Sequence, residues 1–460
     1  MMRKKILLIS LTFLTISGFT QEGSVLKLSL QQAQDYAIEH NKSLKNVRTD
    51  VEIAKQKYWQ TIAQGLPQAS ATVDYTNFFN YEIEFGLGGG GETPNIDYTL
   101  LDAGDLQILS FLQQSMGSGS TTITMKNSSS AKLQVSQLIF SGQYISGIQL
   151  TKISQMLVDL NVVKSEIDVR NSVISTYYLS LLTEKSLELI DANLENLNQT
   201  LVQTKAMLVA GMIEETDVDQ LNMSITMLEN SRRSLMRNVE LNYNILRFQL
   251  GLDYDTEIEL TEDFDGILEN LDISSVLITE FNPSENINIQ MMDKQEEMTK
   301  KLLDMEKWNY APTLVGVYSH NQKIITTDFD MNPKNLVSLN MSIPIFSSGL
   351  RHAKVEQKKL ELYQIQNTKE IVNDQLLMQE KQLRYNLTSA MEQYESQKAN
   401  IELAQRIYNN TELKFRQGVA SSFDLIQANS NLLQAQNAYI SSAMELLQAK
   451  LAFDKLFSKI

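Results

Sequence analysis

The chain contains the same segment twice, and this duplication limits what it can fold into. Residues 210–222 read AGMIEETDVDQLN, and residues 417–429 read QGVASSFDLIQAN. The shared Gly, Asp, Gln and Asn keep one offset, since 418 − 211 and 424 − 217 both equal 207. A second pair, LIFSG at 138–142 and PIFSSG at 344–349, keeps nearly the same offset. Such a repeat predicts two copies of one unit: a strand, a long helix, a Gly turn and another long helix.

The first residues have the features of a secretory signal peptide. Arg3, Lys4 and Lys5 precede an apolar run at 6–19, and small and polar residues follow it. This pattern predicts that residues 1–20 are a signal peptide of an exported protein. A retained anchor is the weaker alternative, because the apolar run falls short of the ~20 residues that span a bilayer. The chain contains no cysteine, so neither a disulfide nor a lipid anchor on Cys contributes.

The chain is acidic, and much of the charge lies in one segment. Its formal net charge is −15, which argues against nucleic acid and other polyanionic partners. Residues 253–284 contain many Asp and Glu residues but no Lys or Arg. We interpret this segment as a solvated connector between a first repeat at 21–252 and a second repeat at 285–460.

Four segments have the period-two alternation of strands, at about 67–81, 131–141, 312–321 and 336–346. In the first, Ala69, Ala71 and Val73 alternate with small polar residues. The pattern suits a sheet with one apolar and one polar face, as in a membrane barrel. A soluble sandwich gives the same pattern, so each strand alone is weak evidence.

Most of the remaining chain is predicted to form very long helices. No Pro or Gly interrupts residues 350–417, where a continuous helix at ~1.5 Å per residue would be roughly 100 Å long. A counterpart is expected at about 148–210. The last helix carries a heptad stripe from Leu425 to Leu456, and a partial second stripe at Leu433, Ile440 and Leu447. Two stripes predict neighbours on both sides, as in a wall of helices.

Strands and helices together predict self-association if the strands lie in a membrane. Unpaired edge groups in hydrocarbon cost several kcal/mol each, so a lipid-exposed sheet must close. Membrane barrels begin at about eight strands, and this chain offers four. It can therefore form a membrane barrel only by sharing one with copies of itself.

The order of these features resembles the TolC-like outer-membrane efflux proteins. The resemblance covers essentially the whole chain after residue 20. It depends on the opening LSLQQA at 28–33, the Pro-led strands at Pro67 and Pro312, the Ile-Phe-Ser strand ends and the two Gly-x5-Asp turns. It implies a homotrimer with a shared 12-stranded β-barrel, continued by a periplasmic α-helical barrel. Periplasmic adaptor and inner-membrane pump proteins would be the partners.

The resemblance also implies roles for the two Gly turns, the tips at 210–213 and 416–420. Adaptor docking would involve Gly211, Met212, Arg416, Gly418 and Val419. A closed-end gate would involve Asp217, Asp424, Gln427 and Phe415. The first tip has Val209 where the family pattern has Arg, and Ala420 stands where a gate Arg is expected. In each case a structural role is an alternative: the glycines as helix C-caps and the aspartates as stabilisers of helix N-termini. A ring of Asp424 in three copies would favour cations and raise the pKa of the carboxyl groups.

The stretch at 78–130 is predicted to be an exposed surface loop, and its role is open. Its run Gly88–Gly91 is followed by no Gly-Lys-Ser/Thr, so it is not a phosphate loop.

His40, His320 and His352 belong to no metal-ligand pattern, and no nucleophile motif is present. We therefore predict no enzyme activity, no cofactor and no metal site.

Together with the features above, the resemblance implies the passive exit duct of a tripartite export system in the outer membrane of a Gram-negative bacterium. Drugs or small amphiphiles are the expected cargo. The same fold serving a type I protein-secretion system is an alternative that the sequence does not separate. A non-conducting coiled-coil surface scaffold is a remote alternative, because it does not explain four amphipathic strands in matched repeats.

Overall fold

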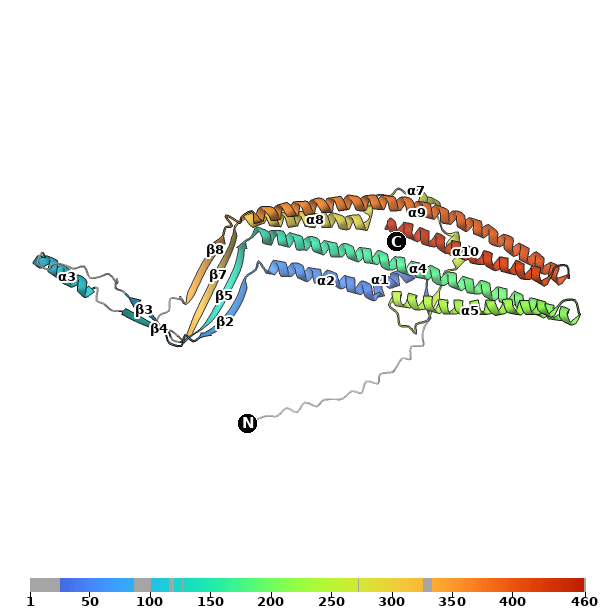
Figure 1. Ribbon diagram of the computed structural model, residues 1–460, viewed down its shortest axis with the longest axis horizontal. Helices are drawn as coiled ribbons and strands as arrows, with labels where there is room; N and C mark the ends of the chain where they lie inside the picture. The colour runs from blue at the N-terminus through green and yellow to red at the C-terminus, as the bar shows by residue number, and fades with distance from the viewer. Residues whose placement is uncertain are drawn as a thin grey trace, which may run out of the picture. The chain divides into compact units, whose positions relative to one another are not determined.

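The computed structural model describes residues 25–86, 101–115, 120–125, 127–271, 273–325 and 333–458. The predicted signal peptide and the run Gly88–Gly91 lie outside these residues. The chain divides into two compact units. A helical unit comprises residues up to 52, 157–294 and 366–460, and a sheet unit comprises 53–156 and 295–365. Figure 1 shows the elements coloured along the chain, from blue at the N-terminus to red at the C-terminus.

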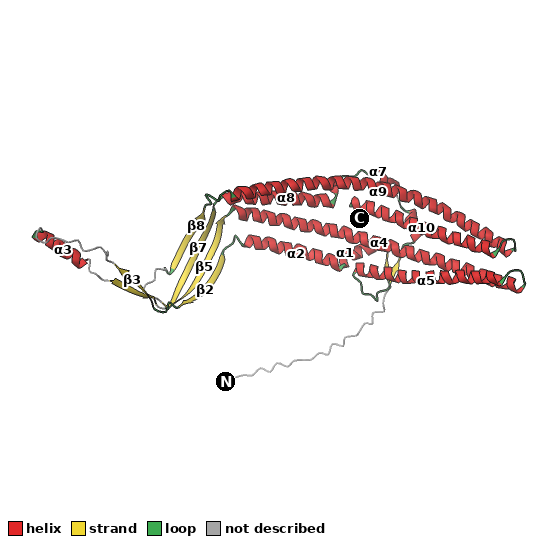
Figure 2. Cartoon of the chain, in the orientation of Figure 1, coloured by secondary structure: helices red, strands yellow, loops and turns green. Residues whose placement is uncertain are grey.

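The sheet unit contains four antiparallel strands in the order β2-β5-β7-β8 (Figure 2). Their bounds are Gln68–Thr76, Ser128–Phe140, Thr313–Ile325 and Asn335–Ser342. Each predicted strand is present, and Pro67 and Pro312 directly precede two of them. The fourth ends at Ser342 rather than at 346, because Pro344 has no N–H to continue the ladder.

The insertion between β2 and β5 contains regular structure, where the sequence predicted only a loop. Strand β3 (Tyr81–Gly86) pairs with β4 (Ser120–Met125), and helix α3 spans Ala103–Ser115. The sequence pattern could have predicted β3, because Tyr81, Ile83 and Phe85 alternate with Glu82 and Glu84, as is typical of a strand.

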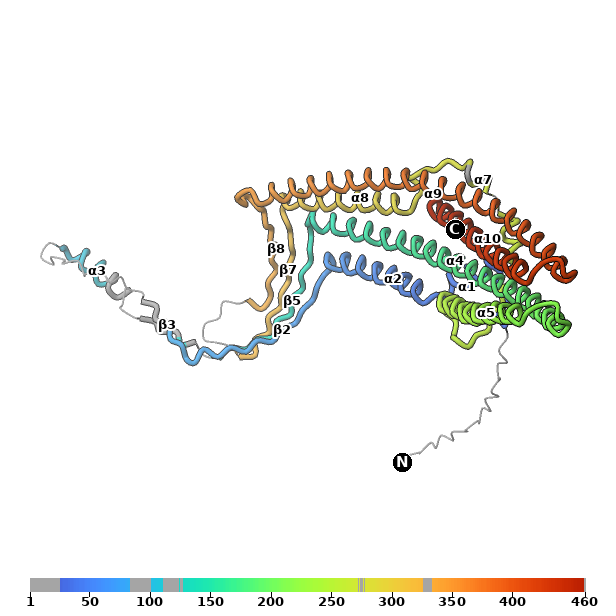
Figure 3. The backbone as a smooth tube through the Cα atoms, turned by 45° about the vertical axis from the view of Figure 1, so that its right-hand side comes forward, coloured from blue at the N-terminus to red at the C-terminus, as the bar shows by residue number. Residues whose placement is uncertain are grey.

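Four long helices dominate the chain: α4 (Gly142–Val209), α5 (Glu215–Leu250), α9 (Leu350–Arg416) and α10 (Ser422–Leu456). Helices α4 and α9 contain 68 and 67 residues, and α9 is continuous as predicted from the absence of Pro and Gly at 350–417. In the helical unit, α5 runs back beside α4 and α10 runs back beside α9, in both the ribbon and tube views (Figures 1 and 3). The duplicated turns are thus the ends of two helical hairpins.

Shorter elements complete the chain: α1 (Leu30–His40), α2 (Lys42–Ala63) and α8 (Ile287–Lys307). The acidic segment holds β6 (Ile258–Leu260), α6 (Phe264–Glu269), α7 (Ile273–Ile278) and a 3-10 turn at Pro283–Glu285. It is therefore more than a solvated connector. Strand β6 pairs in parallel with β1 (Leu26–Leu28), and two apolar side chains of α6 join the main core. These side chains, Phe264 and Leu268, were masked in the sequence by the acids around them.

The core of the helical unit follows the two stripes predicted for α10. Leu446 and Phe453 pack with Leu387 and Ala390 of α9. Ile440 and Leu447 instead lie in the cluster that contains α1 and the middle of α4. Helix α10 therefore buries two faces, as its sequence predicted. Burying a Leu side chain contributes about 1.5–3 kcal/mol, so the double seam stabilises the helix mainly through packing.

Candidate functional site

One face of the four-stranded sheet is apolar and exposed. Val73, Val337, Leu339 and Met341 are 60–79% exposed in the protomer. The register places Ala71 opposite Leu133, Tyr318 opposite Val337 and Leu314 opposite Met341, so most of the exposed apolar residues of the four strands share this face. A contiguous exposed apolar surface requires an apolar phase or a partner to cover it. Strands of 8–13 residues have about the length that spans a bilayer when tilted.

The opposite face of the sheet is mainly polar, although Leu138 and Val315 face each other there and Leu336 lies opposite Ser319. Ser70 pairs with Gln134 and Gln134 with Ser319, while Val315 pairs with Asn340 on the same face. Small hydroxyl and amide side chains can hydrogen-bond to water along this face. An apolar face opposite a polar face is the pattern of a wall that separates lipid from an aqueous lumen.

Both edges of the described sheet are open. Strand β2 pairs only with β5, and β8 pairs only with β7. Backbone N–H and C=O groups at these edges have no partner strand within the described protomer. In hydrocarbon such groups must be paired, so the sheet is incomplete as a membrane structure by itself.

Aromatic side chains gather where the strands join the helices. Phe140 and Trp308 make an edge-to-face contact with ring centroids 6.5 Å apart, and Arg351 lies 5.2 Å above the Tyr310 ring. Gly142 permits this packing, because a Cβ there would lie 2.2 Å from the Trp308 ring. Aromatic residues at the ends of an apolar strand band are typical of membrane interfaces.

The two hairpin ends have the same backbone structure. Gly211 and Gly418 adopt φ of +75° and +74°. At the first end Gly211 N donates to Leu208 O and Met212 N to Met207 O, both at 2.9 Å. The equivalent bonds at the second end join Gly418 to Phe415 and Val419 to Lys414, at 2.8 and 2.9 Å. Both ends are Schellman caps, so the glycines have the structural role given as the alternative to docking.

The predicted gate aspartates begin the helices that follow these caps. Asp424 Oδ2 accepts from Ser421 N at 3.0 Å and from Ser421 Oγ at 2.7 Å, and Asp424 N donates to Ser421 Oγ at 3.1 Å. Asp217 Oδ2 accepts from Glu214 N at 3.0 Å. Hydrogen bonds from Ser421 lower the pKa of Asp424 in the protomer. The structure thus gives both aspartates an N-terminal capping role.

One hydrogen bond joins the two hairpin ends, and the sequence gave no sign of it. Ser422 Oγ donates to Asp217 Oδ1, linking the start of α10 to the start of α5. Asp217 is therefore a cap of its own helix and a contact to the other repeat.

The other predicted residues separate into buried and exposed groups. Phe415 is 2% exposed and packs with Tyr408, Leu425 and Leu432 in the core of the second hairpin. Gln427 Nε2 donates to Asn431 Oδ1 at 3.0 Å, and Arg416 pairs with Glu412 on the same helix. The side chains next to the capping glycines, Met212 and Val419, are 65% and 74% exposed. These two, unlike Phe415, are part of the accessible apolar surface of the tips, together with Val209 and Phe423, which are 90% and 65% exposed.

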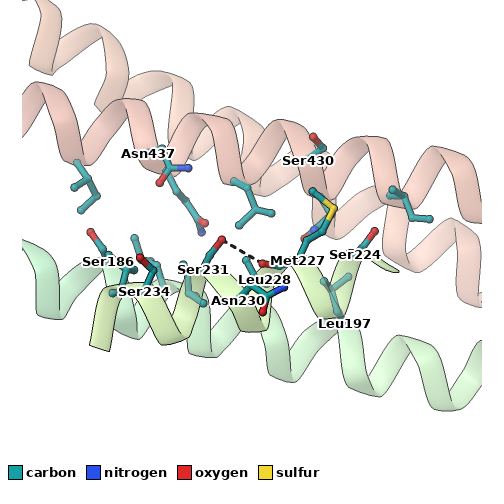
Figure 4. Close-up of a pocket in the computed structure, with 18 residues that line it drawn as sticks. Ser186, Leu197, Ser224, Met227, Leu228, Asn230, Ser231, Ser234, Ser430 and Asn437 are labelled. Atoms are coloured by element: carbon teal, nitrogen blue, oxygen red, sulfur yellow. Dashed lines mark hydrogen bonds between the residues drawn. The ribbon is translucent and has the colours of Figure 1, made fainter. Parts of the chain in front are cut away.

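Further along the hairpins from the tips, a groove of about 710 Å³ lies between α10 and the α4–α5 hairpin (Figure 4). Figure 4 shows Ser224, Ser231 and Ser234 on α5, with Ser430 and Asn437 on α10. The 4% exposed Asn429 also lines the groove, and its Oδ1 has no hydrogen-bond partner. Sequence reasoning missed this groove. The sequence does contain a pattern that could have predicted it: polar residues recur at seven-residue intervals on α5 and α10. The pairs are Ser224 and Ser231, Asn429 and Gln436, and Ser430 and Asn437.

The described residues contain neither a membrane-spanning helix nor a metal-binding cluster. None of the helices there has both the length and the apolar character to cross a membrane. No group of three or more His, Asp or Glu side chains in the described ranges is arranged to hold a metal ion.

Comparison with known proteins gives a family and a fold. Residues 284–457 match the family described as Outer membrane efflux protein. No curated protein sequence matches the chain. Among solved structures, it resembles the outer membrane protein VceC of Vibrio cholerae, at 13% identity and a TM-score of 0.66, with 93% of this chain and 96% of that chain covered.

Two further structures show the same fold. The Campylobacter jejuni CmeC outer membrane channel has 15% identity and a TM-score of 0.68, covering 93% of this chain and 85% of its own. The open-state Neisseria gonorrhoeae MtrE outer membrane channel has 14% identity and a TM-score of 0.68, with 93% and 88% covered. The likeness spans both repeats, so the fold of the efflux channels extends beyond the matched region.

The match at residues 284–457 and the likeness in fold bear on several predictions. The resemblance to TolC-like channels is confirmed, as is the mainly helical fold with a small membrane β part. The family match supports the predicted location in the outer membrane. Its class is a channel rather than an enzyme, and its general function is that of an efflux exit duct.

Proposed function

We propose that three copies of this protein form the passive outer-membrane duct of a tripartite efflux system. The observation that carries this proposal is the four-stranded sheet with one exposed apolar face and two open edges. Three copies supply twelve strands, which is enough for a membrane barrel, whereas one copy supplies four. Closure would pair the open edge groups that hydrocarbon does not tolerate.

The strand directions support closure between copies. Strands alternate in direction across the order β2-β5-β7-β8, so the two edge strands are antiparallel to each other. The β8 edge of one copy can therefore pair antiparallel with the β2 edge of the next, and the pattern continues around a ring. A head-to-tail contact of this type closes under cyclic symmetry.

The hairpin ends are the proposed docking surface for a periplasmic adaptor and an inner-membrane pump. Met212 and Val419 are exposed apolar side chains beside rigid Schellman caps, and Arg416 adds a charge at the second end. Exposed apolar residues on rigid elements suit a protein contact. Gly211 and Gly418 contribute by fixing the turn.

We assign the gate to the same ends. In a ring of copies, Asp424 and Gln427 would repeat around the axis, and the contact between Ser422 and Asp217 would hold the two hairpins of each copy together. Phe415 would act from within the hairpin core as packing support. Opening would separate the hairpins and break the Ser422–Asp217 contact.

Single-channel recording tests the duct and the gate together. The signal-cleaved protein is purified in detergent, its oligomer is verified, and its conductance in planar bilayers is compared with that of Asp424→Ala and Ser422→Ala variants. We expect a small conductance in the wild type and a larger one in both variants. The charge-matched control is Asp253→Ala, in the acidic segment. Sealed bilayers for inserted oligomers of every variant would contradict the duct.

Docking is tested by substitution of the exposed tip residues. Met212→Asp and Val419→Asp should abolish crosslinking to the adaptor while leaving oligomer and conductance unchanged. Ile278→Asp, at a residue 81% exposed on α7, is the matched control. Unchanged crosslinking in the tip variants would contradict docking at these ends.

Cells that lack the protein test the cargo. If drugs or small amphiphiles are the cargo, the cells should become sensitive to them. If only an exported protein is lost and drug sensitivity is unchanged, the duct serves protein secretion.

A further inference from the structure

The four strands of the sheet contain three charged residues, and all are near one end. Asp74 lies near the end of β2, Lys132 near the start of β5 and Lys323 near the end of β7, while β8 has no charged residue. Each position is far from the helix that adjoins its strand. The charges therefore cluster at the end of the sheet opposite the helices.

The register places all three charges on the polar face. Asp74 pairs with Ser130, and Ser130 pairs with Lys323. Lys132 pairs with Asn321 one step away along the same face. Lys132 is thus a diagonal neighbour of both Asp74 and Lys323, a relationship that corresponds to about 7–8 Å between strands.

Two local features add to the cluster. Asn321 N donates to Lys334 O at 2.7 Å, which brings a third lysine to the same level beside the start of β8. The register shifts between Ser129 and Ser130, so Ile324 opposes no residue of β5. Bulges of this kind redirect neighbouring side chains and are frequent at the rims of barrels.

The sign of this cluster is opposite to that of the whole chain. The formal charge of the chain is −15, whereas the strands contribute two lysines and one aspartate at this level. A lysine on a lipid-facing surface is destabilising, and none lies on the apolar face of the sheet. Rings of Lys or Arg side chains are the means by which pores favour anions.

We propose that Lys132 and Lys323, with Lys334 beside them, form a cationic collar in the outer half of the lumen that favours anionic solutes. This inference rests on the proposed duct, in which the polar face lines the lumen and the end opposite the helices faces the exterior. It names the cargo class as small amphiphiles that carry negative charge. Fixed charges in a narrow lumen raise the local concentration of the opposite ion.

Reversal potentials in a KCl gradient test the collar. We expect the double variant Lys132→Gln/Lys323→Gln to lower the chloride-to-potassium permeability ratio by about threefold. This corresponds to roughly half a kT of local potential, because the potential shifts anions and cations in opposite directions. Asp74→Asn should raise the ratio. Lys42→Gln/Lys45→Gln removes the same charge from α2 and is the matched control. The difference should shrink in 1 M salt, where the Debye length is about 3 Å.

A second measurement separates the collar from the hairpin ends. Inorganic tripolyphosphate added on the exterior side should block wild-type current, and its blocking rate should fall in the double lysine variant but not in Asp424→Ala. Conducting channels with unchanged selectivity and block would overturn the collar and leave the duct intact. Absence of conductance in all variants would overturn the duct and the collar together. If the lysines instead altered insertion into anionic lipid, without a change in selectivity, they would face headgroups and the collar would be wrong.

Discussion

At the scale of single residues, Tyr408 provides the clearest test of packing in the second hairpin. Its side chain is 1% exposed and its hydroxyl has no hydrogen-bond partner. Burial raises the pKa of Tyr408 to about 12. A buried, unpaired hydroxyl costs about 1–3 kcal/mol, so Tyr408→Phe should stabilise the hairpin by up to about that amount. Denaturant unfolding measures the change, and Tyr408→Leu, which alters the shape of the core, should instead destabilise it.

The aspartate caps give a prediction for pH. The pKa of Asp424 is lowered by hydrogen bonds from Ser421, so its folded pKa lies below its unfolded pKa. Its contribution is therefore complete above the unfolded value of about 3.9 and is lost as pH falls through the folded value. The protection factors for amide exchange at the start of α10, taken relative to the intrinsic exchange rate at each pH, should fall at low pH in the wild type. In Ser421→Ala this dependence should be weaker, at a capping cost of about 1 kcal/mol. An identical pH profile in the variant would contradict the assignment.

The repeat offset made some residue roles predictable and left others hidden. Asp217 and Asp424 share an offset and follow a Gly turn, so a capping role could be proposed from sequence alone. The burial of Phe415 could not, because it depends on the rotation of α9 against α10. The contact between Ser422 and Asp217 joins residues 205 positions apart and has no local signal.

At the scale of elements, the capping glycines can be separated from ordinary helical glycines. Gly418 has φ of +74°, a conformation that costs other L-residues about 1–2 kcal/mol. Gly147 lies inside α4, and a Cβ there would meet nothing within 4 Å. Gly418→Ala should therefore destabilise the protein by about 1–2 kcal/mol, whereas Gly147→Ala should stabilise it by about 0.5–1 kcal/mol. Equal effects in thermal or denaturant unfolding would show that the turn geometry does not matter.

The long helices and the four strands were predictable because their periodicity extends over many residues. Helix α10 shows this most clearly, since both of its apolar stripes are buried in different clusters. Shorter elements were missed, because in the acidic segment Phe264 and Leu268 are surrounded by carboxylates. Their burial depends on a core formed by α1 and α4, which a local pattern does not record.

At the scale of the whole molecule, the two faces of the sheet must have opposite tolerances for charge. Val337 and Ser338 are adjacent on β8, with Val337 on the apolar face and Ser338 on the polar face. In the proposed barrel, Val337→Lys places an ammonium group against lipid, at a cost of up to about 2–4 kcal/mol near the midplane. Ser338→Lys places the same group in water at almost the same height, so it should cost little.

Folding into lipid bilayers measures this difference. Val337→Lys should lower the yield of inserted oligomer and the free energy of unfolding from the bilayer, and Ser338→Lys should leave both near the wild-type values. Because the two variants have the same charge, strand and new side chain, a general effect of lysine on β8 cancels. Equal losses in both variants would mean that the face of β8 carrying Val337 does not contact lipid. The closed barrel of three copies would then lose its main support.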